Sequence, residues 1–301
     1  MASTRTQPKL PQFHVVVTTH TDRHLRNTLL SLTQQTLAPA SITVTVDGEH
    51  ATVQDVVERT SNDTGVPLNC VTRRHMGEPR RAQTRNNGVR ALLENDVSQN
   101  DWLLFIDGDC IGAPDLIATH ATSASSAGFS IGYFLNLTEE QTADLTEDHV
   151  IDHDWIAGIC APHIESLLMR QQRYEKQLLL RRFFLTKRHK PKAVTGNVAL
   201  SLESFTAVNG FDEAYTAWGF EDDDFSRRLY KKKYRPAIVV DRALVLHQWH
   251  KSLRESDWLK NQSAKRFRKS GRHPASCVMG LKTPAPQPEP ICRHFNAATS
   301  C

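Results

Sequence analysis

The chain has 301 residues, of which 39% are hydrophobic and 23% are charged, a composition that argues against an intrinsically disordered protein. The formal net charge is +4, which by itself gives no reason to expect a nucleic-acid partner. The sequence has no apolar run long enough to span a bilayer, and the polar segment 1–9 lacks the pattern of a secretory signal. With six cysteines and no export signal, we expect reduced thiols and a cytoplasmic protein.

Strand-like and helix-like segments alternate through the first third of the chain. Apolar or alternating patterns predict the strands, and apolar residues at helical spacing predict the helices between them. The expected strands cover residues 13–19, 42–46, 67–72 and 102–106, and the expected helices cover 22–37, 53–59 and 80–94. This order is typical of an α/β fold with a mostly parallel sheet flanked by helices. Ligands of such sheets bind beyond the carboxyl ends of the strands.

The remainder of the chain continues with mixed elements. We expect a strand over 128–135, a long basic helix over 165–192, helices over 201–208 and 221–234, and strands over 237–240 and 243–246. The proline-rich sequence after Lys282 has no core-forming pattern, so it predicts a linker or tail.

A pair of acids directly follows the apolar strand 102–106. Asp107 and Asp109 lie two residues apart at the strand end, where their carboxylates can converge on one divalent cation, and oxygen ligands suit Mg²⁺ or Mn²⁺. An ordinary Asp-Gly turn is the alternative, but the position after a buried strand favours a metal site. His247 and His250 follow the last strand and could add nitrogen ligands to the same ion, or they could be structural.

Two further polar clusters suggest chemistry. Glu221 and Asp222 begin a run of four acids, which complements the dipole at a helix start but also creates a repulsion that a cation or substrate could relieve. Such a carboxylate can act as general base toward a hydroxyl. Arg80, Arg81, Arg85 and Asn86 lie near the start of another helix, where guanidinium groups could bind a diphosphate or form a solvated basic face.

Taken together, these segments resemble family 2-type glycosyltransferases with the GT-A fold, and the C-terminal half resembles the galactosyltransferase-type catalytic module. The resemblance covers residues 12–252. It is carried by the first strand 13–20, the "V-D-D-G"-like strand end 45–48, the "ARNxG"-like helix start 77–88, the DxD motif 105–109, and an acceptor-side block at 195–199, 209–213 and 218–229. The chain departs from the family at Thr18, where proline is usual, at Thr84 in place of alanine, and at Asp47, which stands without a second aspartate.

The resemblance implies a GT-A domain over residues 12–253, with a nucleotide-binding part over 12–110 and an acceptor part over 111–253. A C-terminal extension with a partly disordered tail would follow over 254–301. The implied activity is metal-dependent transfer of a sugar from a nucleotide sugar, commonly a UDP-sugar, to an acceptor hydroxyl with inversion. The acceptor would be a carbohydrate, a lipid-linked hydroxyl or another hydroxyl compound.

The resemblance also implies roles for individual residues. Asp222 would be the catalytic base, with Glu221 beside it, and Trp218 would stack on the acceptor, although it could equally be a core residue. The metal ligands would be Asp107, Asp109, His247 and His250, holding Mn²⁺ or Mg²⁺. The donor-binding residues would be Thr18, Asp47, Arg81, Arg85, Asn86, Asp107 and Gly196.

Other interpretations stay open at this point. The segment 170–192 carries nine basic residues and Glu175 as its single acid. It is best interpreted as an amphipathic helix packed on the domain with its charges in water, and peripheral contact of 165–192 with an anionic membrane is the alternative. The competing functions are a nucleotide-sugar-binding domain without turnover and a metal-dependent phosphohydrolase or nucleotidyltransferase that uses Asp107 and Asp109.

Overall fold

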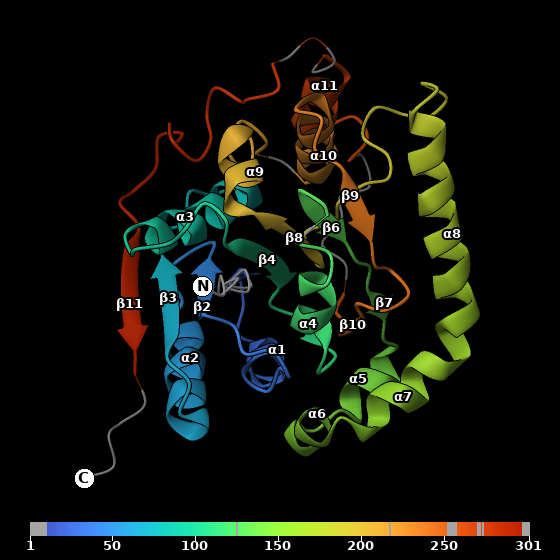
Figure 1. The fold of residues 1–301 in the computed structure, drawn as a ribbon. Helices are drawn as coiled ribbons and strands as arrows, with labels where there is room; N and C mark the ends of the chain where they lie inside the picture. The colour runs from blue at the N-terminus through green and yellow to red at the C-terminus, as the bar shows by residue number, and fades with distance from the viewer. Residues whose placement is uncertain are drawn as a thin grey trace, which may run out of the picture.

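The computed structural model describes residues 11–124, 126–216, 218–251, 258–269, 272 and 274–296. Within these residues, an eight-stranded sheet in the order β11-β3-β2-β1-β4-β8-β6-β9 forms the centre of the molecule (Figure 1). The strands are β1 (Phe13–Thr19), β2 (Ser41–Val46), β3 (Leu68–Thr72), β4 (Trp102–Asp107), β6 (Phe129–Ile131), β8 (Val198–Ser201), β9 (Pro236–Ile238) and β11 (Ile291–Phe295).

The first four strands form a continuous parallel block. β1 pairs with β2 on one side and with β4 on the other, and β2 pairs with β3, all in parallel. Helices α1 (Leu25–Thr33), α2 (Ala51–Thr64) and α3 (Arg81–Leu93) connect these strands. The expected α/β fold class with a mostly parallel sheet is confirmed. In the register of β1 and β4, Thr18 lies opposite Asp107, so the carboxyl ends of the two strands meet at one edge of the sheet.

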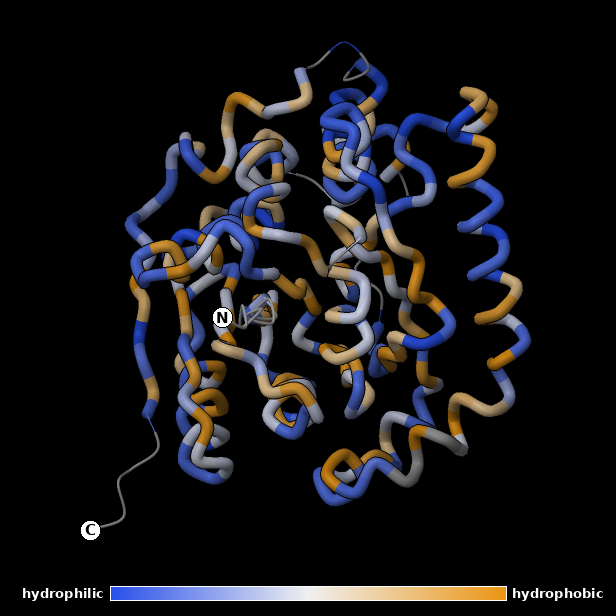
Figure 2. The backbone as a smooth tube through the Cα atoms, in the orientation of Figure 1, coloured by the Kyte–Doolittle hydropathy of each residue, from blue (hydrophilic) through white to orange (hydrophobic). Residues whose placement is uncertain are grey.

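Hydrophobic residues alternate between the two faces of the sheet and form a core on each. Val15 and Val17 of β1 pack with residues of α1 and α2 on one face, whereas Val16 packs with α3, α9 (Leu202–Ala207) and α10 (Glu221–Lys231) on the other. Side chains alternate in this way because successive residues of a strand point to opposite faces. Figure 2 shows hydrophobic colour on the strands of the sheet and on stretches of the helices around it.

A smaller sheet covers the end of β4. Its strands β5 (Cys110–Gly112), β10 (Val245–His247) and β7 (Leu135–Asn136) lie in the order β5-β10-β7. β10 runs antiparallel to β5, with His247 opposite Cys110. The chain therefore passes from Asp109 directly into β5, so that Cys110 and His247, which are 137 positions apart, become neighbours.

The remaining described helices lie outside the sheets. They are α4 (Leu116–Ala121), α5 (Glu139–Ala143), α6 (Glu147–Asp152), α7 (Asp154–Cys160), the 3-10 helix η1 (Ala161–His163), α8 (Ile164–Arg181) and α11 (Gln262–Lys269). α8 runs along the outside of the molecule (Figure 1) and is attached to the sheet through Gln171, whose amide donates to the carbonyl of Ile238 and accepts from the N–H of Val240, both at 3.0 Å. No described helix is both long and apolar enough to cross a membrane.

Three expectations about elements differ from the structure. The basic helix ends at Arg181 instead of Lys192, and the strand expected over 128–135 is divided into β6 and β7. The segment after Lys282, expected to be a tail without a core-forming pattern, includes β11, which pairs antiparallel with β3. The segment is held by distant polar side chains, because Gln83 donates to the carbonyl of Ala285 at 3.0 Å, and no local hydrophobic pattern signals such contacts.

Candidate active site

The acidic turn after β4 is fixed by hydrogen bonds to its backbone. The N–H of Gly108 donates to the carbonyl of Thr18 at 2.8 Å, and the carbonyl of Gly108 accepts from the hydroxyl of Thr28 at 3.0 Å. The carbonyl of Asp109 accepts from the N–H of Gln248 at 2.8 Å. A Cβ at position 108 would lie 2.7 Å from Cβ of Thr19, so glycine lets β1 and the turn approach closely. The backbone around both carboxylates is therefore well defined.

Asp109, His247 and His250 form a compact group beyond the end of β4. Nε2 of His250 lies 3.2 Å from Oδ2 of Asp109, and Nε2 of His247 lies 3.6 Å from the same oxygen. One ligand atom from each residue lies within 4.8 Å of the other two. One carboxylate oxygen and two imidazole nitrogens at such spacing fit a divalent cation.

The protonation states of this group are coupled through Asp109. Burial raises the pKa of the Asp109 carboxyl, but its hydrogen bond to His250 and the nearby His247 outweigh burial, and the net pKa lies below the usual value. The hydrogen bond to Asp109 raises the pKa of His250, against the opposing effect of burial. The carboxylate is thus held in the charged form that a cation requires.

Asp107, expected to be a metal ligand, has a different neighbour. It does not belong to the compact group of potential metal ligands found among the described residues, and its Oδ1 lies 3.3 Å from Nη2 of Arg85. Burial raises the pKa of Asp107, and the Arg85 charge offsets this effect in part. The structure therefore assigns Asp107 to an ion pair and leaves its ligand role as a prediction.

Arg85 is the residue that joins the two acidic clusters. Its side chain is 4% exposed. Nη1 lies 3.4 Å from Oε1 of Glu221 and 4.0 Å from Oδ1 of Asp222, while Nη2 contacts Asp107. Arg85 was expected to bind a donor diphosphate. In the structure its guanidinium is instead buried among three carboxylates of the chain itself. Its position supports a role in holding the acids together.

The four adjacent acids at the start of α10 are separated by their partners. Glu221 contacts Arg85 at 3.4 Å, Asp222 accepts from the hydroxyl of Thr195 at 3.1 Å, Asp223 contacts Lys192 at 3.1 Å, and Asp224 contacts Arg228 at 2.7 Å. These separate partners reduce the repulsion between the four carboxylates that the sequence led us to expect. Burial, and after it the neighbouring Asp222, raise the pKa of Glu221. Glu221 and Asp222 thus face Arg85, whereas Asp223 and Asp224 serve other contacts.

Gly196 lies beside Asp107 at the centre of the site. A Cβ at this position would lie 3.0 Å from the ring of Phe134 and 3.5 Å from Oδ2 of Asp107. The ring of Phe134 stacks on His247 with centroids 5.3 Å apart. The absence of a side chain at 196 therefore lets the ring of Phe134 pack closely against the backbone beside Asp107.

The other expected donor-binding residues occupy different positions. Thr18 has a buried hydroxyl without a hydrogen-bond partner among the described residues. The charge of Arg81 acts on Glu221 and on His20. Thr18 and Arg81 therefore lie at the site. The Asp47 carboxylate contacts Arg73 at 2.5 Å and accepts from the N–H of Arg80 at 2.6 Å.

Asn86, expected to bind the donor, is hydrogen-bonded to other parts of the chain, and its donor contact stays a prediction. It is completely buried, its Nδ2 donates to the carbonyl of Phe211 and to Glu213, both at 2.8 Å, and its Oδ1 accepts from the N–H of Phe211. All its polar atoms therefore hold the 209–213 loop against α3.

Trp218 lies in the loop before α10. Its ring packs edge-on against Trp258 with centroids 5.2 Å apart, and its carbonyl accepts from Asn261 at 2.9 Å. It is half-buried, so an acceptor-stacking role stays a prediction.

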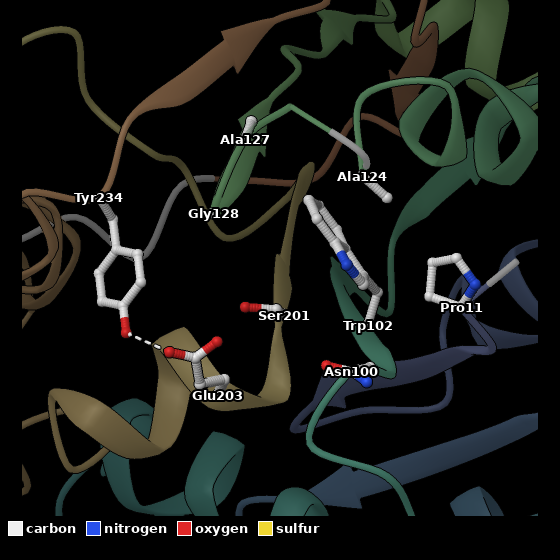
Figure 3. A pocket seen from close by; sticks show the side chains of 9 residues that line it. All are labelled: Pro11, Asn100, Trp102, Ala124, Ala127, Gly128, Ser201, Glu203 and Tyr234. Carbon is white, nitrogen blue, oxygen red and sulfur yellow. Dashed lines mark hydrogen bonds between the residues drawn. The ribbon is translucent and has the colours of Figure 1, made fainter. Parts of the chain in front are cut away.

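A cavity among the described residues lies away from the candidate site. It has a volume of about 350 Å³ and is lined by Trp102, Ser201 and Tyr234 among others (Figure 3). Trp102 begins β4, whereas Asp107 ends it, so the cavity is at the opposite edge of the sheet. Within it, the hydroxyl of Tyr234 donates to Glu203. This cavity is therefore separate from the candidate site at the carboxyl end of β4.

Several contributors were missed by the sequence-based reasoning. Gln248 lies between the two histidines and holds Asp109 through its backbone, and its Oε1 accepts from Asn27 at 3.0 Å. Nε2 of His24 donates to the carbonyl of Trp249 at 3.0 Å. The position of Gln248 inside the His-Gln-Trp-His segment was an available signal, but nothing local distinguishes Asn27 or His24.

A family model and a solved structure both match this chain. The family model described as the N-terminal domain of galactosyltransferase matches residues 180–250. A crystal structure titled GalNAc-T7 with UDP, GalNAc and Mn²⁺ superposes with a TM-score of 0.51 at 14% identity, covering 92% of this chain and 54% of that chain. The chain has the GT-A glycosyltransferase fold. Its segment 180–250, with the start of α10 and the end of β10, is the galactosyltransferase-like part of that GT-A fold.

Curated relatives of this GT-A chain have transferase names. Validoxylamine A glucosyltransferase of Streptomyces hygroscopicus subsp. limoneus is 29% identical over 241 residues, covering 73% of this chain and 48% of the relative. Its counterpart from subsp. jinggangensis is 28% identical, with 73% and 52% covered. Mouse beta-1,4-galactosyltransferase 1 is 44% identical over 54 residues, 17% of this chain and 14% of the relative. The chain thus spans about half the length of the two bacterial relatives.

Proposed function

We propose that the chain is a glycosyltransferase that moves a sugar from a nucleotide sugar to an acceptor hydroxyl in the presence of a divalent cation. The observation that carries the proposal is the meeting of Asp109, His247 and His250 with the Arg85-linked acids at the carboxyl end of β4. The transferase names of the relatives support the same reaction class. The solved structure with UDP and Mn²⁺ supports a uridine nucleotide as donor.

The cation would be held by Asp109, His247 and His250. When bound, it would neutralise the negative charge that grows on the departing diphosphate. Imidazole nitrogens are poor ligands for Mg²⁺, which prefers oxygen and water, so this mixed donor set favours Mn²⁺. Arg81, at the edge of the site, is the guanidinium that we assign to the diphosphate, because Arg85 is already engaged with carboxylates.

Asp222 is the general base of the proposed reaction. Its Oδ1 accepts the 3.1 Å hydrogen bond from Thr195, whereas Oδ2 accepts a longer one of 3.5 Å from the N–H of the same residue. Oδ2 is therefore the oxygen that takes the acceptor proton. The acceptor oxygen forms a bond to the anomeric carbon as the bond from that carbon to the diphosphate oxygen breaks. A base on the attacking side implies one displacement, with inversion of the anomeric centre.

Glu221 supports this base through electrostatics. Because its pKa is raised by burial and by Asp222, Glu221 takes up a proton more readily than an ordinary glutamate, and the proton relieves the repulsion between the two neighbours. The Arg85 guanidinium lies within 4.0 Å of the carboxylates of both Glu221 and Asp222, so it holds the two acids together at the start of α10.

A panel of nucleotide sugars tests the function. The chain is incubated with each donor, Mn²⁺ and a mixture of simple glycosides and polyprenol-linked acceptors, and release of nucleoside diphosphate and formation of a glycosylated product are both measured. We expect both signals with one donor class, and product anomericity opposite to that of the donor. Donor binding without either signal would support a binding domain without turnover. Monophosphate release without glycosylated product would support a phosphohydrolase.

A further inference from the structure

The turn that ends α8 presents three consecutive apolar side chains to solvent. Phe183, Phe184 and Leu185 are 65%, 94% and 69% exposed. Phe184 is the most exposed large hydrophobic residue in the described part of the chain. Figure 2 shows the hydrophobic colour at the end of α8 that lies farthest from α7. Isolated exposed apolar residues are common, but a contiguous group at one point of the surface indicates contact with something apolar.

The backbone of this turn holds Phe184 in an unfavourable conformation. Phe184 has φ +60°, and the N–H of Leu185 donates to the carbonyl of Leu180 while that of Phe184 donates to Arg181, both at 3.1 Å. This pair of bonds is the Schellman motif, in which the left-handed position is usually glycine. A bulky residue there is an outlier that lowers stability. Stability therefore gives no reason for phenylalanine at this position.

The side chain of Arg181 fixes the conformation of this turn. Its guanidinium donates to the carbonyl of Lys190 at 3.1 Å and to that of Arg188 at 3.0 Å, and it stacks over the ring of Tyr230 at 3.6 Å. The returning chain is tied to the body of the domain where Lys192 contacts Asp223 at 3.1 Å. The apolar side chains are thus presented on a supported loop.

Uncompensated positive charge surrounds the apolar tip. Arg182, Lys187 and Arg188 are exposed, and among the described residues none of them has a carboxylate within 4.0 Å. The sequence from 176 to 192 contains no Asp or Glu. The nearby Asp223 is already engaged with Lys192 and His189. The tip therefore combines aromatic and leucine side chains with a basic rim.

We propose that this tip, residues 182–188, inserts into an anionic lipid surface. Aromatic and leucine side chains enter the interface between headgroups and acyl chains, and the basic rim is attracted to anionic headgroups. A protein partner fits less well, because a stable protein interface buries about 800 Å² on each side, more than three adjacent side chains on a convex turn supply. The tip is a lipid-binding element independent of the proposed catalysis.

Vesicle co-sedimentation of the full chain tests the proposal. The vesicles are phosphatidylcholine alone, or equal parts of phosphatidylcholine and phosphatidylglycerol, each at low and high salt. We expect binding to the anionic vesicles at low salt, with weaker binding at high salt. In Phe184→Gly we expect about tenfold weaker partitioning together with a higher melting temperature, because glycine adopts the left-handed conformation without cost. Weaker lipid binding together with a higher melting temperature distinguishes a lipid-binding role of Phe184 from a structural one.

Two further variants sharpen the test. The pair Lys187→Glu and Arg188→Glu reverses charge at the rim and should weaken anionic binding by well over tenfold, since each basic residue contributes about fivefold. The control pair Leu168→Ser and Met169→Ser removes exposed apolar side chains from the same helix outside the tip, and binding should not change.

Three results would overturn the proposal. These are no binding of the unaltered chain to anionic vesicles at low salt, equal binding by Phe184→Gly, and a dimer in light scattering without lipid that Phe184→Gly converts to a monomer. The last outcome would make the tip an interface between two copies. Because no readout uses turnover, failure of the proposed transferase activity leaves the result unaffected.

Discussion

At the level of single residues, the Arg85 guanidinium contacts Asp107 at the end of β4 and Glu221 and Asp222 at the start of α10. A buried charge has to be paired to be tolerated, and here one cation is shared by three anions. The Arg85 guanidinium thereby links Asp107, on the donor side of the proposed reaction, to Asp222, the proposed base. Glycine at 196 allows Phe134 and Asp107 to approach the backbone closely.

Asp222→Asn should abolish most of the proposed activity. The amide cannot accept the acceptor proton, and removal of a general base lowers kcat by about 10²–10⁴-fold. Steady-state kinetics of diphosphate release measures the change. Asp223→Asn is the matched control, because Asp223 contacts Lys192 and His189, and its kcat should fall far less. Equal losses in the two variants would contradict the assignment of the base.

Arg85→Gln should destabilise the fold as well as the activity. Removing one partner of a buried ion pair costs about 3–5 kcal/mol in the free energy of unfolding, and the Arg85 side chain is nearly inaccessible to the water that would screen it. Urea denaturation followed by circular dichroism measures the loss. Arg81→Gln, at a half-buried position, should raise KM for the donor with little change in stability. Wild-type stability of Arg85→Gln would refute the shared ion pair.

Removal of the cation, or of its ligands, should stop the reaction. EDTA treatment is expected to abolish diphosphate release, with Mn²⁺ restoring it better than Mg²⁺. Titration calorimetry should show Mn²⁺ binding that disappears in Asp109→Ala and weakens in His250→Ala. His149→Ala, on α6 and outside the site, provides the control. Activity indifferent to EDTA, or unchanged Mn²⁺ affinity in Asp109→Ala, would exclude the metal site proposed here.

At the level of elements, Asn197 shows how the strands around the site are held in place. Its Nδ2 donates to the carbonyls of Tyr133 at 2.7 Å and Ala243 at 2.8 Å, so its Oδ1 is the acceptor for Nε2 of His120 at 2.8 Å. One side chain thereby connects β8 with α4 and with the segments before β7 and β10. Gly196 and Thr195 directly precede it, so this network positions the site.

Removal of β11 should lower stability without removing the site. A chain ending at Pro290 loses the antiparallel pairing with β3 and the packing of Phe295 against the core, which we estimate at about 2 kcal/mol. For a domain of this size the melting temperature should fall by roughly 4–8 °C, as measured by differential scanning calorimetry. Phe295→Ala separates the side-chain part from the strand pairing. An unchanged melting temperature in the shortened chain would show that β11 contributes nothing.

At the scale of the whole molecule, the candidate site lies where the parallel block of the large sheet meets the small sheet. β4 leads directly into β5, and the pairing of β5 with β10 returns His247 to the same place. The segments that supply the site come from residues 18–109 and 195–250. Stability of the complete fold and integrity of the site are therefore linked.

Acidification should destabilise the fold through His120. Burial lowers its pKa from 6.5 to about 4, against the opposing effect of its hydrogen bond to Asn197. The unfolded chain binds a proton below pH 6.5 and the folded chain does not until pH 4, so stability is complete above pH 6.5 and falls between pH 6.5 and 4. The shift corresponds to about 3 kcal/mol.

Urea denaturation at a series of pH values measures this dependence. The pKa of His189 is also lowered to about 4 by burial, so the slope of the unaltered chain contains both residues. His120→Gln should show a shallower slope, whatever its stability at neutral pH. The same slope in both proteins would contradict the assignment to His120.

Short-range patterns determined the strands and helices of the first third, because period-two and helical spacing of apolar residues depends only on neighbours in the chain. β1 has the bounds expected from the sequence, and the DxD and His-Gln-Trp-His segments were identified as metal-binding candidates by residue type and position. The GT-A fold was also expected from ordered motifs, and the comparison confirmed it. For the bounds of β1 and for the fold the sequence was sufficient, whereas the metal-binding role of the two segments stays a prediction.

Only the tertiary structure decided which polar side chains face the site. Asn86 and Arg85 are neighbours on α3, yet one holds a loop and the other joins three carboxylates. The partner of a buried polar group is chosen by whichever distant segment packs against it, as with Gln83 and the carbonyl of Ala285. Gln83 and Ala285, for example, are 202 positions apart. The periodicity of residues within one segment carries no information about which distant segment will pack against it.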